Sequence, residues 1–204
     1  IPEEPTSWAD MWGDYPNQLG LLALPANSFL LEITATTFFG GTDILSTEDG
    51  VLEVIGKLAE LQDNVQLWYR DEGQFQQALQ SGDIPIGQYY HDVTGLAAAD
   101  GFPVRSTFPQ EGGVLDSGSW AVTRASDKLE EAQVFINWFM QPRVQDLVAR
   151  SIGTAPTVER EHLSLSEEEF AAVSSEIEPI IPRYDIYLEM GDWINQIWAE
   201  RITR

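Results

Sequence analysis

The sequence contains no cysteine, only two histidines and few basic residues. The absence of cysteine excludes a disulfide framework, a thiolate nucleophile and a cysteine-based metal site. The 11 lysines and arginines are outnumbered by 33 aspartates and glutamates, which gives a net charge of -22 at pH 7. This charge opposes a sequence-independent grip on phosphate backbones, so nucleic acids and anionic membrane surfaces are poor partners. It is typical of a solvated acidic surface, and it also favours a cationic ligand.

Long apolar segments are missing as well. No run of 18 or more apolar residues marks a membrane-spanning helix, and the first four residues lack the basic and apolar regions of a signal peptide. We therefore expect that a signal segment was removed or that the chain begins inside a longer gene product. With 204 residues, 43% of them hydrophobic, and seven tryptophans, the chain is long enough to bury a core as one large domain or two small ones.

Signatures of common enzyme sites are also absent from the sequence. It has no P-loop, no dinucleotide-binding glycine fingerprint, no HExxH zinc pair and no GxSxG elbow. His91 and His162 are its two histidines, and Asp116 with His91 is the acid–base pair that an enzyme on this fold would use. We predict that the protein is not an enzyme and holds no cofactor.

Apolar runs alternate with amphipathic segments along the chain. Residues 19–24, 65–69 and 84–90 are predicted strands. One helix is predicted to run through Phe38 from a cap at Asn27 or Ser28, and others at 47–61, 72–79, 93–99, 129–139 and 188–202. Two more strand-like runs, 102–108 and 120–123, flank a turn at 109–113. Alternating strands and helices predict an α/β layered fold.

Three expected helix starts carry the pattern of a capping box. A serine or aspartate is followed three residues later by an acidic side chain, so that the two can satisfy each other's backbone N–H groups. The pattern occurs at Ser7 and Asp10, at Asp127 and Glu130, and at Ser166 and Glu169.

Tyr89-Tyr90-His91-Asp92 follows a predicted strand, where binding sites in open α/β sheets gather. These four residue types can bind cations or a metal, but neighbours on a strand point to opposite faces, so at most two serve one site. The alternative is one ring in the core and one on the surface.

Two polar turns are further candidates. Asn27 and Ser28 follow the first predicted strand, and their N–H groups are suited to a ligand carboxylate or phosphate, or to capping alone. The segment 115–119, with Asp116, Ser117 and Gly118, separates two apolar runs. Its composition fits close backbone approach to a ligand, and it fits a plain connecting turn equally well.

Three segments resemble the spermidine/putrescine-binding proteins of bacterial ABC importers, which have the type 2 periplasmic-binding fold. They are Pro-Thr-Ser-Trp-Ala-Asp-Met-Trp at 5–12, Pro-Gln-Glu-Gly-Gly at 109–113, and 127–156. The last of these includes Gln-Pro-Arg-Val at 141–144 and Ile-Gly-Thr-Ala-Pro at 152–156. The resemblance covers nearly the whole chain in order.

The resemblance implies an α/β, type 2 periplasmic-binding-protein-like fold with one complete lobe plus the returning part of the other. It assigns residues 1–116 and 168–204 to lobe two and 117–167 to the returning segment of lobe one, and most of lobe one is expected to be missing. It implies a periplasmic or extracellular receptor that closes about a hinge on its solute and then meets an ABC permease.

In that family, aromatic rings enclose the methylenes of a polyamine and carboxylates meet its ammonium groups. By position, a lobe-two tryptophan of the family falls on Tyr90, a crossover tryptophan on Asp116, the tyrosine after the Ile-Gly pair on Thr154, and a late glutamine on Tyr187. With the two polar turns, the predicted ligand-binding set is Asn27, Ser28, Tyr90, Asp116, Ser117, Thr154 and Tyr187. The predicted solute is a polyamine or a related small cation.

Two alternatives remain open from the sequence. The adjacent Tyr89 and Tyr90 are similar to the tyrosine pair of ferric-ion receptors, so they are the candidate metal ligands. Otherwise the chain is an incomplete fragment with no independent binding. An incomplete lobe exposes apolar surface, so self-association is expected.

Overall fold

The computed structural model describes residues 4–203, which form two compact units. The first, here called the sheet unit, runs through Tyr89, resumes at Thr107–Leu115 and continues from Ile177 onward. The second, the helical unit, comprises Tyr90–Ser106 and Asp116–Glu176. The chain passes from one unit to the other after Tyr89, Ser106, Leu115 and Glu176. The assignment of residues to lobes made from the sequence stays a prediction.

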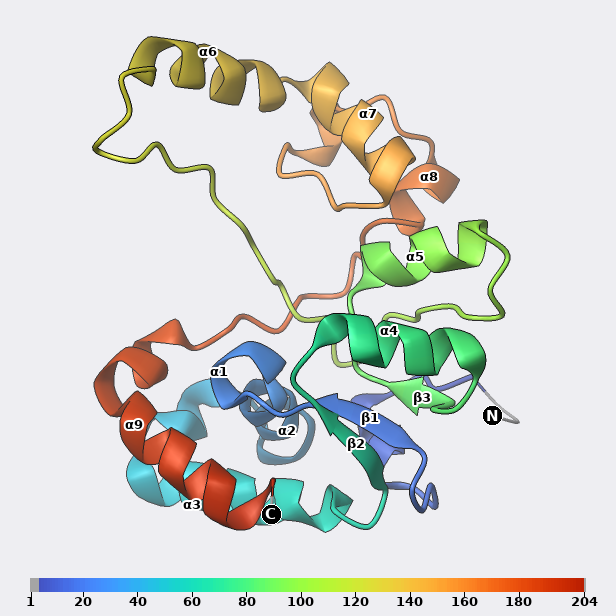
Figure 1. Cartoon of the computed structure of the whole chain (residues 1–204), viewed down its shortest axis with the longest axis vertical. Helices are drawn as coiled ribbons and strands as arrows, with labels where there is room; N and C mark the ends of the chain where they lie inside the picture. Colours follow the sequence, from blue (N-terminus) through green and yellow to red (C-terminus); the bar gives the residue numbers. More distant parts are fainter. Residues whose placement is uncertain (1–3, 204) are drawn as a thin grey trace. The chain divides into compact units, whose positions relative to one another are not determined.

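The sheet unit is built on three parallel strands (Figure 1). Strand β1 (Leu19–Leu22) lies in the centre, between β2 (Val65–Tyr69) and β3 (Ile86–Gly87). All four residues of β1 are buried. A parallel strand that is covered on both faces reads as a continuous apolar run, which is why the sequence located it. The predicted α/β fold is confirmed.

Helices surround this sheet. The described ones of the sheet unit are η1 (Trp8–Trp12), α1 (Pro25–Ser28), α2 (Leu30–Phe39), η2 (Thr42–Ser46), α3 (Glu48–Leu58), η3 (Ala59–Leu61), α4 (Glu72–Ser81) and α9 (Tyr184–Arg201), where η marks 3-10 helices. Helix α3 shows why they form. Its Thr47 cap accepts a hydrogen bond from the N–H of Gly50 at 3.1 Å, and its apolar side chains recur at helical spacing toward the core.

The core of the sheet unit contains fully buried side chains from β1, α2, α3 and α9. They include Leu19, Leu21, Leu30, Ile33, Val51, Ile55, Leu58 and Ile194. Burying one such side chain stabilises the fold by about 1.5–3 kcal/mol. Trp198 is buried too, and its indole N–H donates to the carbonyl of Ala23 at 2.9 Å. That bond ties the last helix to the chain leaving the central strand.

The helical unit contains α5 (His91–Ala99), α6 (Leu129–Phe139), α7 (Pro142–Ile152), η4 (Arg160–His162) and α8 (Glu167–Ala171). The buried Asp146 on α7 accepts hydrogen bonds from the N–H and the hydroxyl of Ser164, the latter at 2.6 Å. Arg150 pairs with Glu169 at 2.7 Å. Hydrogen bonds from Arg150 and from the N–H of Ser166 lower the pKa of Glu169 to about 2. These contacts hold the loop after α7 against α7 and α8.

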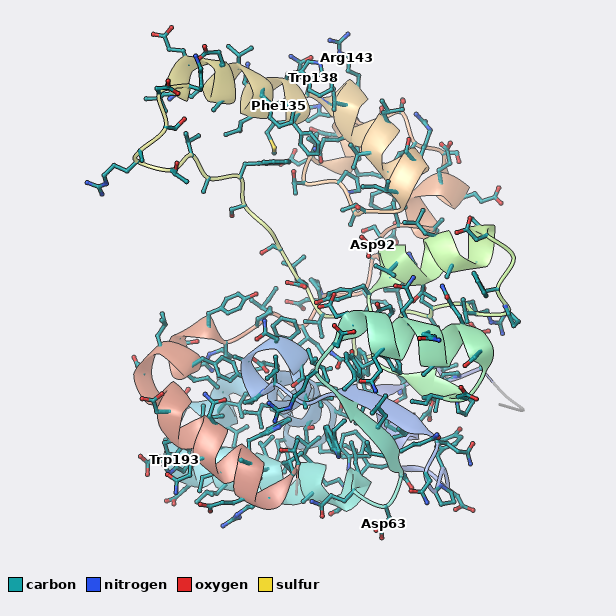
Figure 2. The ribbon with its side chains drawn as sticks, viewed as in Figure 1. Asp63, Asp92, Phe135, Trp138, Arg143 and Trp193 are labelled. Carbon is teal, nitrogen blue, oxygen red and sulfur yellow. The ribbon has the colours of Figure 1, made fainter. Side chains whose placement is uncertain are left out.

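Helix α6 differs from the other long helices because none of its side chains is buried. Val134 is 71% exposed, and Phe135 and Trp138 both project from this helix (Figure 2). The rings of Phe135 and Phe139 also pack against Trp120, with centroids 5.3 Å apart in both pairs. The amphipathic pattern predicted the helix, but its apolar face meets little of the described chain.

Three expectations from the sequence are wrong. The described structure has no strand in 102–108 or 120–123. Helix α6 starts after Lys128 without a side-chain cap, so Asp127 does not form the expected capping box. The helix expected to run to Phe38 forms as α2, but neither Asn27 nor Ser28 caps it, because its N-cap is Phe29 in a left-handed conformation (φ 54°). None of the described helices is long and apolar enough to cross a membrane.

Gly20 in the central strand leaves room for Phe75. A Cβ at position 20 would lie 2.1 Å from the ring of Phe75, which is fully buried and stacked on Tyr69 with centroids 4.5 Å apart. We expect Gly20→Ala to lower the free energy of unfolding by about 1–3 kcal/mol, because the buried ring of Phe75 would have to shift against the side chains packed on it.

Gly56 is the matched control for this substitution. It is exposed on α3, and no atom would lie within 4 Å of an added Cβ. Gly56→Ala should therefore raise the free energy of unfolding by about 1 kcal/mol through helix propensity. Urea denaturation followed by tryptophan fluorescence measures both. Equal stability of the two variants would contradict the packing described here.

Candidate functional site

The candidate site of the sheet unit lies where the chain leaves β1 and β3. The chain places β2 on one side of β1 and then β3 on the other side, so the connections that follow β1 and β3 run in opposite directions along the sheet. Ligands of open α/β sheets bind beyond the carboxyl ends of the strands at such a point. The segment after β1 leads into α1, and Gln88 follows β3 directly. The Gln88 side-chain NH₂ donates to the carbonyl of Ser28, so the two segments are joined.

The α1 turn carries the predicted residues Asn27 and Ser28. Their N–H groups both donate to the carbonyl of Leu24, at 3.2 and 2.8 Å. The Ser28 hydroxyl donates to the carbonyl of Pro25 at 3.3 Å. The N–H groups of these two residues are therefore engaged within the turn, as capping alone requires, and their use by a ligand stays a prediction. The side chain of Asn27 is exposed.

The predicted residue Tyr187 reaches the same turn from α9. Its hydroxyl lies 3.2 Å from the carbonyl oxygen of Pro25 and 3.1 Å from a carboxylate oxygen of Glu32. Glu32 is completely buried in α2, and its other oxygen accepts the N–H of Arg183 at 2.9 Å. Burial raises the pKa of Glu32, although the hydrogen bonds from Arg183 and Tyr187 oppose this. Burial and the nearby Glu32 charge raise the pKa of Tyr187. Tyr187 thus contacts the α1 turn at Pro25 and supports it from helix α9.

The adjacent tyrosines fall in different units. The ring of Tyr89 belongs to an aromatic cluster of the sheet unit, with centroids 5.1 Å from Phe75 and 6.4 Å from Tyr69. Its hydroxyl donates to the carbonyl of Glu72 at 3.2 Å. Tyr90 precedes α5 in the helical unit, where its carbonyl accepts the hydroxyl of Thr94 at 2.8 Å. A metal site made of both tyrosines stays a prediction.

His91 is held at both ring nitrogens inside the helical unit. Nε2 lies 2.6 Å from the carbonyl of Ala172, and Nδ1 lies 2.6 Å from the hydroxyl of Ser106. Because a carbonyl accepts only, Nε2 carries a hydrogen and donates to Ala172. This ring fastens the start of α5 to two other segments. Both ring nitrogens of His91 are therefore engaged in hydrogen bonds.

The remaining predicted residues lie in the helical unit. Asp116 and Ser117 are exposed and start the segment after Leu115. Thr154 is exposed and follows Gly153, which ends α7 with φ 75°. A Cβ at Gly153 would lie 3.6 Å from the Cα of Asp92, so Thr154 follows a point where α7 ends beside the start of α5. That brings its segment near the one that Tyr90 begins.

Two connecting segments of the sheet unit are paired in parallel. Val114 bridges Ile180, and the N–H of Leu115 donates to the carbonyl of Ile180 at 3.0 Å. Gly112 has φ 97°, and a Cβ there would lie 2.2 Å from the carbonyl oxygen of Glu178. Each segment is adjacent to a point where the chain crosses from one unit to the other, which is after Leu115 for the first and after Glu176 for the second.

Glu111 fixes this pair of segments to η1. One carboxylate oxygen accepts the N–H of Trp8 at 3.0 Å and the other accepts the Ser7 hydroxyl, while the Trp8 indole donates to the carbonyl of Gly112 at 2.8 Å. Partial burial acts to raise the pKa of Glu111, but the hydrogen bonds from Ser7 and Trp8 lower it overall. These hydrogen bonds therefore hold the Ser-Trp segment against the Pro-Gln-Glu-Gly-Gly turn, both of which were noted in the sequence.

Residues 2–170 match the family model of bacterial extracellular solute-binding proteins. The chain belongs to this family. The family is one of extracellular solute-binding proteins and not of enzymes, and curated relatives are periplasmic, so the predicted class of protein and the predicted location outside the cytoplasm are those of the family.

Two curated relatives show how the family resemblance extends. The chain is 27% identical over 162 residues to a gamma-aminobutyric acid-binding protein of Pseudomonas aeruginosa, covering 76% of this chain and 45% of the relative. It is 27% identical over 153 residues to a spermidine/putrescine-binding periplasmic protein of Salmonella typhimurium, covering 74% and 42%. The resemblance noted in the sequence is confirmed. The chain spans less than half the length of these relatives.

Solved structures show the same fold. The periplasmic binding protein MotA of A. tumefaciens B6, in complex with glucopine, superposes with a TM-score of 0.75 at 20% identity, covering 96% of this chain and 63% of MotA. An ABC transporter substrate-binding protein of Bradyrhizobium japonicum superposes with a TM-score of 0.72 at 21% identity, covering 98% and 63%. The type 2 periplasmic-binding fold expected from the sequence is thereby confirmed.

Proposed function

We propose that this solute-binding family member is the receptor component of an ABC importer, takes a small solute that carries an ammonium group, and works by hinge closure. The observation that carries the proposal is the family match over residues 2–170. The two-unit architecture with its paired connecting segments supports it. The predicted ligand contacts belong to this proposal, namely Asn27, Ser28, Tyr90, Asp116, Ser117, Thr154 and Tyr187.

The mechanism of capture is a shift between two populations. A solute that contacts both units in one arrangement, and a single unit in another, favours the first by the difference in its binding free energy. Hinges absorb such a change in a few residues at the ends of elements. The pairing of Val114 with Ile180 makes the segments before Asp116 and after Glu176 the candidate hinge, because it holds them side by side.

An ammonium-bearing solute is supported by charge and by similarity. The net charge of -22 attracts cations at long range. The two curated relatives are named for gamma-aminobutyric acid and for spermidine and putrescine, all of which carry amino groups. Aromatic side chains such as Tyr90 bind ammonium groups through their ring faces.

Isothermal titration calorimetry of the chain with putrescine, spermidine and gamma-aminobutyric acid tests this proposal. We expect at least one of these amines to bind with a dissociation constant in the micromolar range. Succinate, a four-carbon compound with no amino group, is the control, and we expect no binding of it. Millimolar or weaker binding of all three amines would contradict the proposed solute class.

A permease and a second copy of the chain are the proposed protein partners. The ABC permease follows from the receptor role. Self-association is supported by the exposed apolar face of α6, where Leu129 is 53% and Val134 is 71% exposed. We expect light scattering to show a mass that rises with protein concentration, and Val134→Glu to reduce that rise by placing a charge in the face. A constant monomer mass would contradict the self-association.

A further inference from the structure

Gln88 has a buried amide oxygen without a hydrogen-bond partner among the described residues. Its side-chain NH₂ donates to the carbonyl of Ser28, which fixes the direction of the amide. Exchanging the amide oxygen and nitrogen would place two acceptors against each other, so the free position is an oxygen. Its backbone is held as well, because the N–H donates to the carbonyl of Gly20 at 3.3 Å and its carbonyl accepts the Tyr69 hydroxyl at 2.8 Å.

A buried acceptor without a donor is unfavourable, and native proteins rarely leave one unless it has a use. Gln88 follows the end of β3, beside the turn that follows β1, where the strand order reverses. Gln88 therefore lies at the end of the sheet where ligands of open α/β sheets bind. The orphaned atom and the topology point independently to the same place.

The polar groups near Gln88 indicate which kind of solute group its amide oxygen can bind. The N–H groups of Asn27 and Ser28 donate to Leu24, and the Ser28 hydroxyl donates to Pro25. The Tyr187 hydroxyl is hydrogen-bonded to the Glu32 carboxylate next to the α1 turn. These donors are used, whereas the Gln88 oxygen is an unused acceptor. Among these groups the Gln88 oxygen is the one without a partner, so an N–H group of a solute would find an acceptor here.

We infer that Gln88 is a solute-contacting residue and that its amide oxygen accepts a hydrogen bond from an N–H of the solute. This inference rests on the proposed function and deepens it, because it assigns the amino end of the solute to the sheet unit. A group at hydrogen-bond distance, about 2.7–3.2 Å, supplies the missing donor. A site built around such an acceptor rejects an analogue that lacks the donor, because the acceptor is then left unpaired.

Calorimetry of Gln88→Met with putrescine tests the inference. Methionine keeps the length of the side chain and removes the amide, so we expect putrescine affinity to fall by about tenfold or more. The matched control is Gln77→Met, because Gln77 is exposed on α4, and we expect its affinity to equal that of the unmodified chain. Unchanged affinity in both variants overturns the role of Gln88 and leaves the proposed function standing. No putrescine binding by the unmodified chain overturns both.

A second measurement needs no variant to fold. In ¹H–¹⁵N spectra of the unmodified chain, the Gln88 side-chain amide should shift on addition of putrescine and stay unchanged with succinate. An amide that stays unchanged while putrescine binds, as measured by calorimetry, shows that a buried water or nothing satisfies the oxygen. That outcome overturns the inference even if Gln88→Met is unfolded.

Discussion

Replacing Glu32 with alanine is expected to lower the free energy of unfolding by about 2–4 kcal/mol. The change leaves a cavity in α2 and removes the acceptor of the Arg183 N–H, and each of these effects is destabilising. It also removes the second partner of the Tyr187 hydroxyl, which supports the α1 turn at Pro25. Chemical denaturation followed by circular dichroism measures the loss.

Glu32→Gln is the matched control, and it should be at least as stable as the unmodified chain at neutral pH. The glutamine oxygen can accept the Arg183 N–H, and its NH₂ can donate to the Tyr187 oxygen while that hydroxyl donates to Pro25. No charge is then buried. A loss in Glu32→Gln equal to that in Glu32→Ala would show that the carboxylate charge itself is required, contrary to this account.

The pH dependence of the same pair follows from the raised pKa of Glu32. A carboxyl with a folded pKa above its unfolded value contributes stability that is fully present below the unfolded pKa and is lost as pH rises through the folded pKa. The advantage of Glu32→Gln over the unmodified chain should therefore grow between pH 5 and pH 8. The charged group that acts on Glu32 is the Arg183 guanidinium, which is itself paired with Asp185 and influenced by Asp43. A constant difference across this range would contradict the direction of the shift.

Gly112→Ala is expected to be the second large effect, with a loss of about 2–4 kcal/mol. An alanine at φ 97° is strained, and its Cβ would lie 2.2 Å from the carbonyl oxygen of Glu178. The paired segments must separate to admit it, which breaks the Leu115 and Ile180 hydrogen bonds. Because these segments adjoin the points where the chain crosses between the units and form the proposed hinge, putrescine affinity should fall as well.

Gly118→Ala is the control for Gly112. Gly118 is exposed in the segment after Asp116, and no atom would lie within 4 Å of an added Cβ. We expect its stability to change by less than about 0.5 kcal/mol. Thermal denaturation compares the two variants. If Gly112→Ala is as stable as Gly118→Ala, the close pairing at Glu178 is wrong.

Local sequence signals located much of the sheet unit. The apolar run at β1 predicted a buried strand, and Ser7 with Asp10 predicted the capping box that the structure forms. Ser166 and Glu169 form the expected box as well. These signals depend on residues that are close together in the sequence, so the sequence alone predicts them. Strands at 102–108 and 120–123 were not formed, because a strand needs a partner and its residues alone do not supply one.

The candidate site depended on contacts that a single sequence hides. Glu32 is one of 33 acidic residues, and only its burial against Arg183 and Tyr187 distinguishes it from a solvated carboxylate. Gln88 was missed because a lone glutamine after a strand forms no motif. Conversely, Asn27 and Ser28 were correctly placed at a strand end, but the left-handed Phe29 shortened their helix to a turn that uses its own N–H groups.

The central claim, that a solute closes the two units about a hinge, is tested most directly by a distance between them. The sequence has no cysteine, so Gln77→Cys on α4 and Glu130→Cys on α6 place one spin label in each unit. Pulsed electron–electron double resonance should show a broad distribution of label distances without putrescine and a narrower, shifted one with saturating putrescine. An unchanged distribution in protein that binds putrescine by calorimetry would contradict hinge closure.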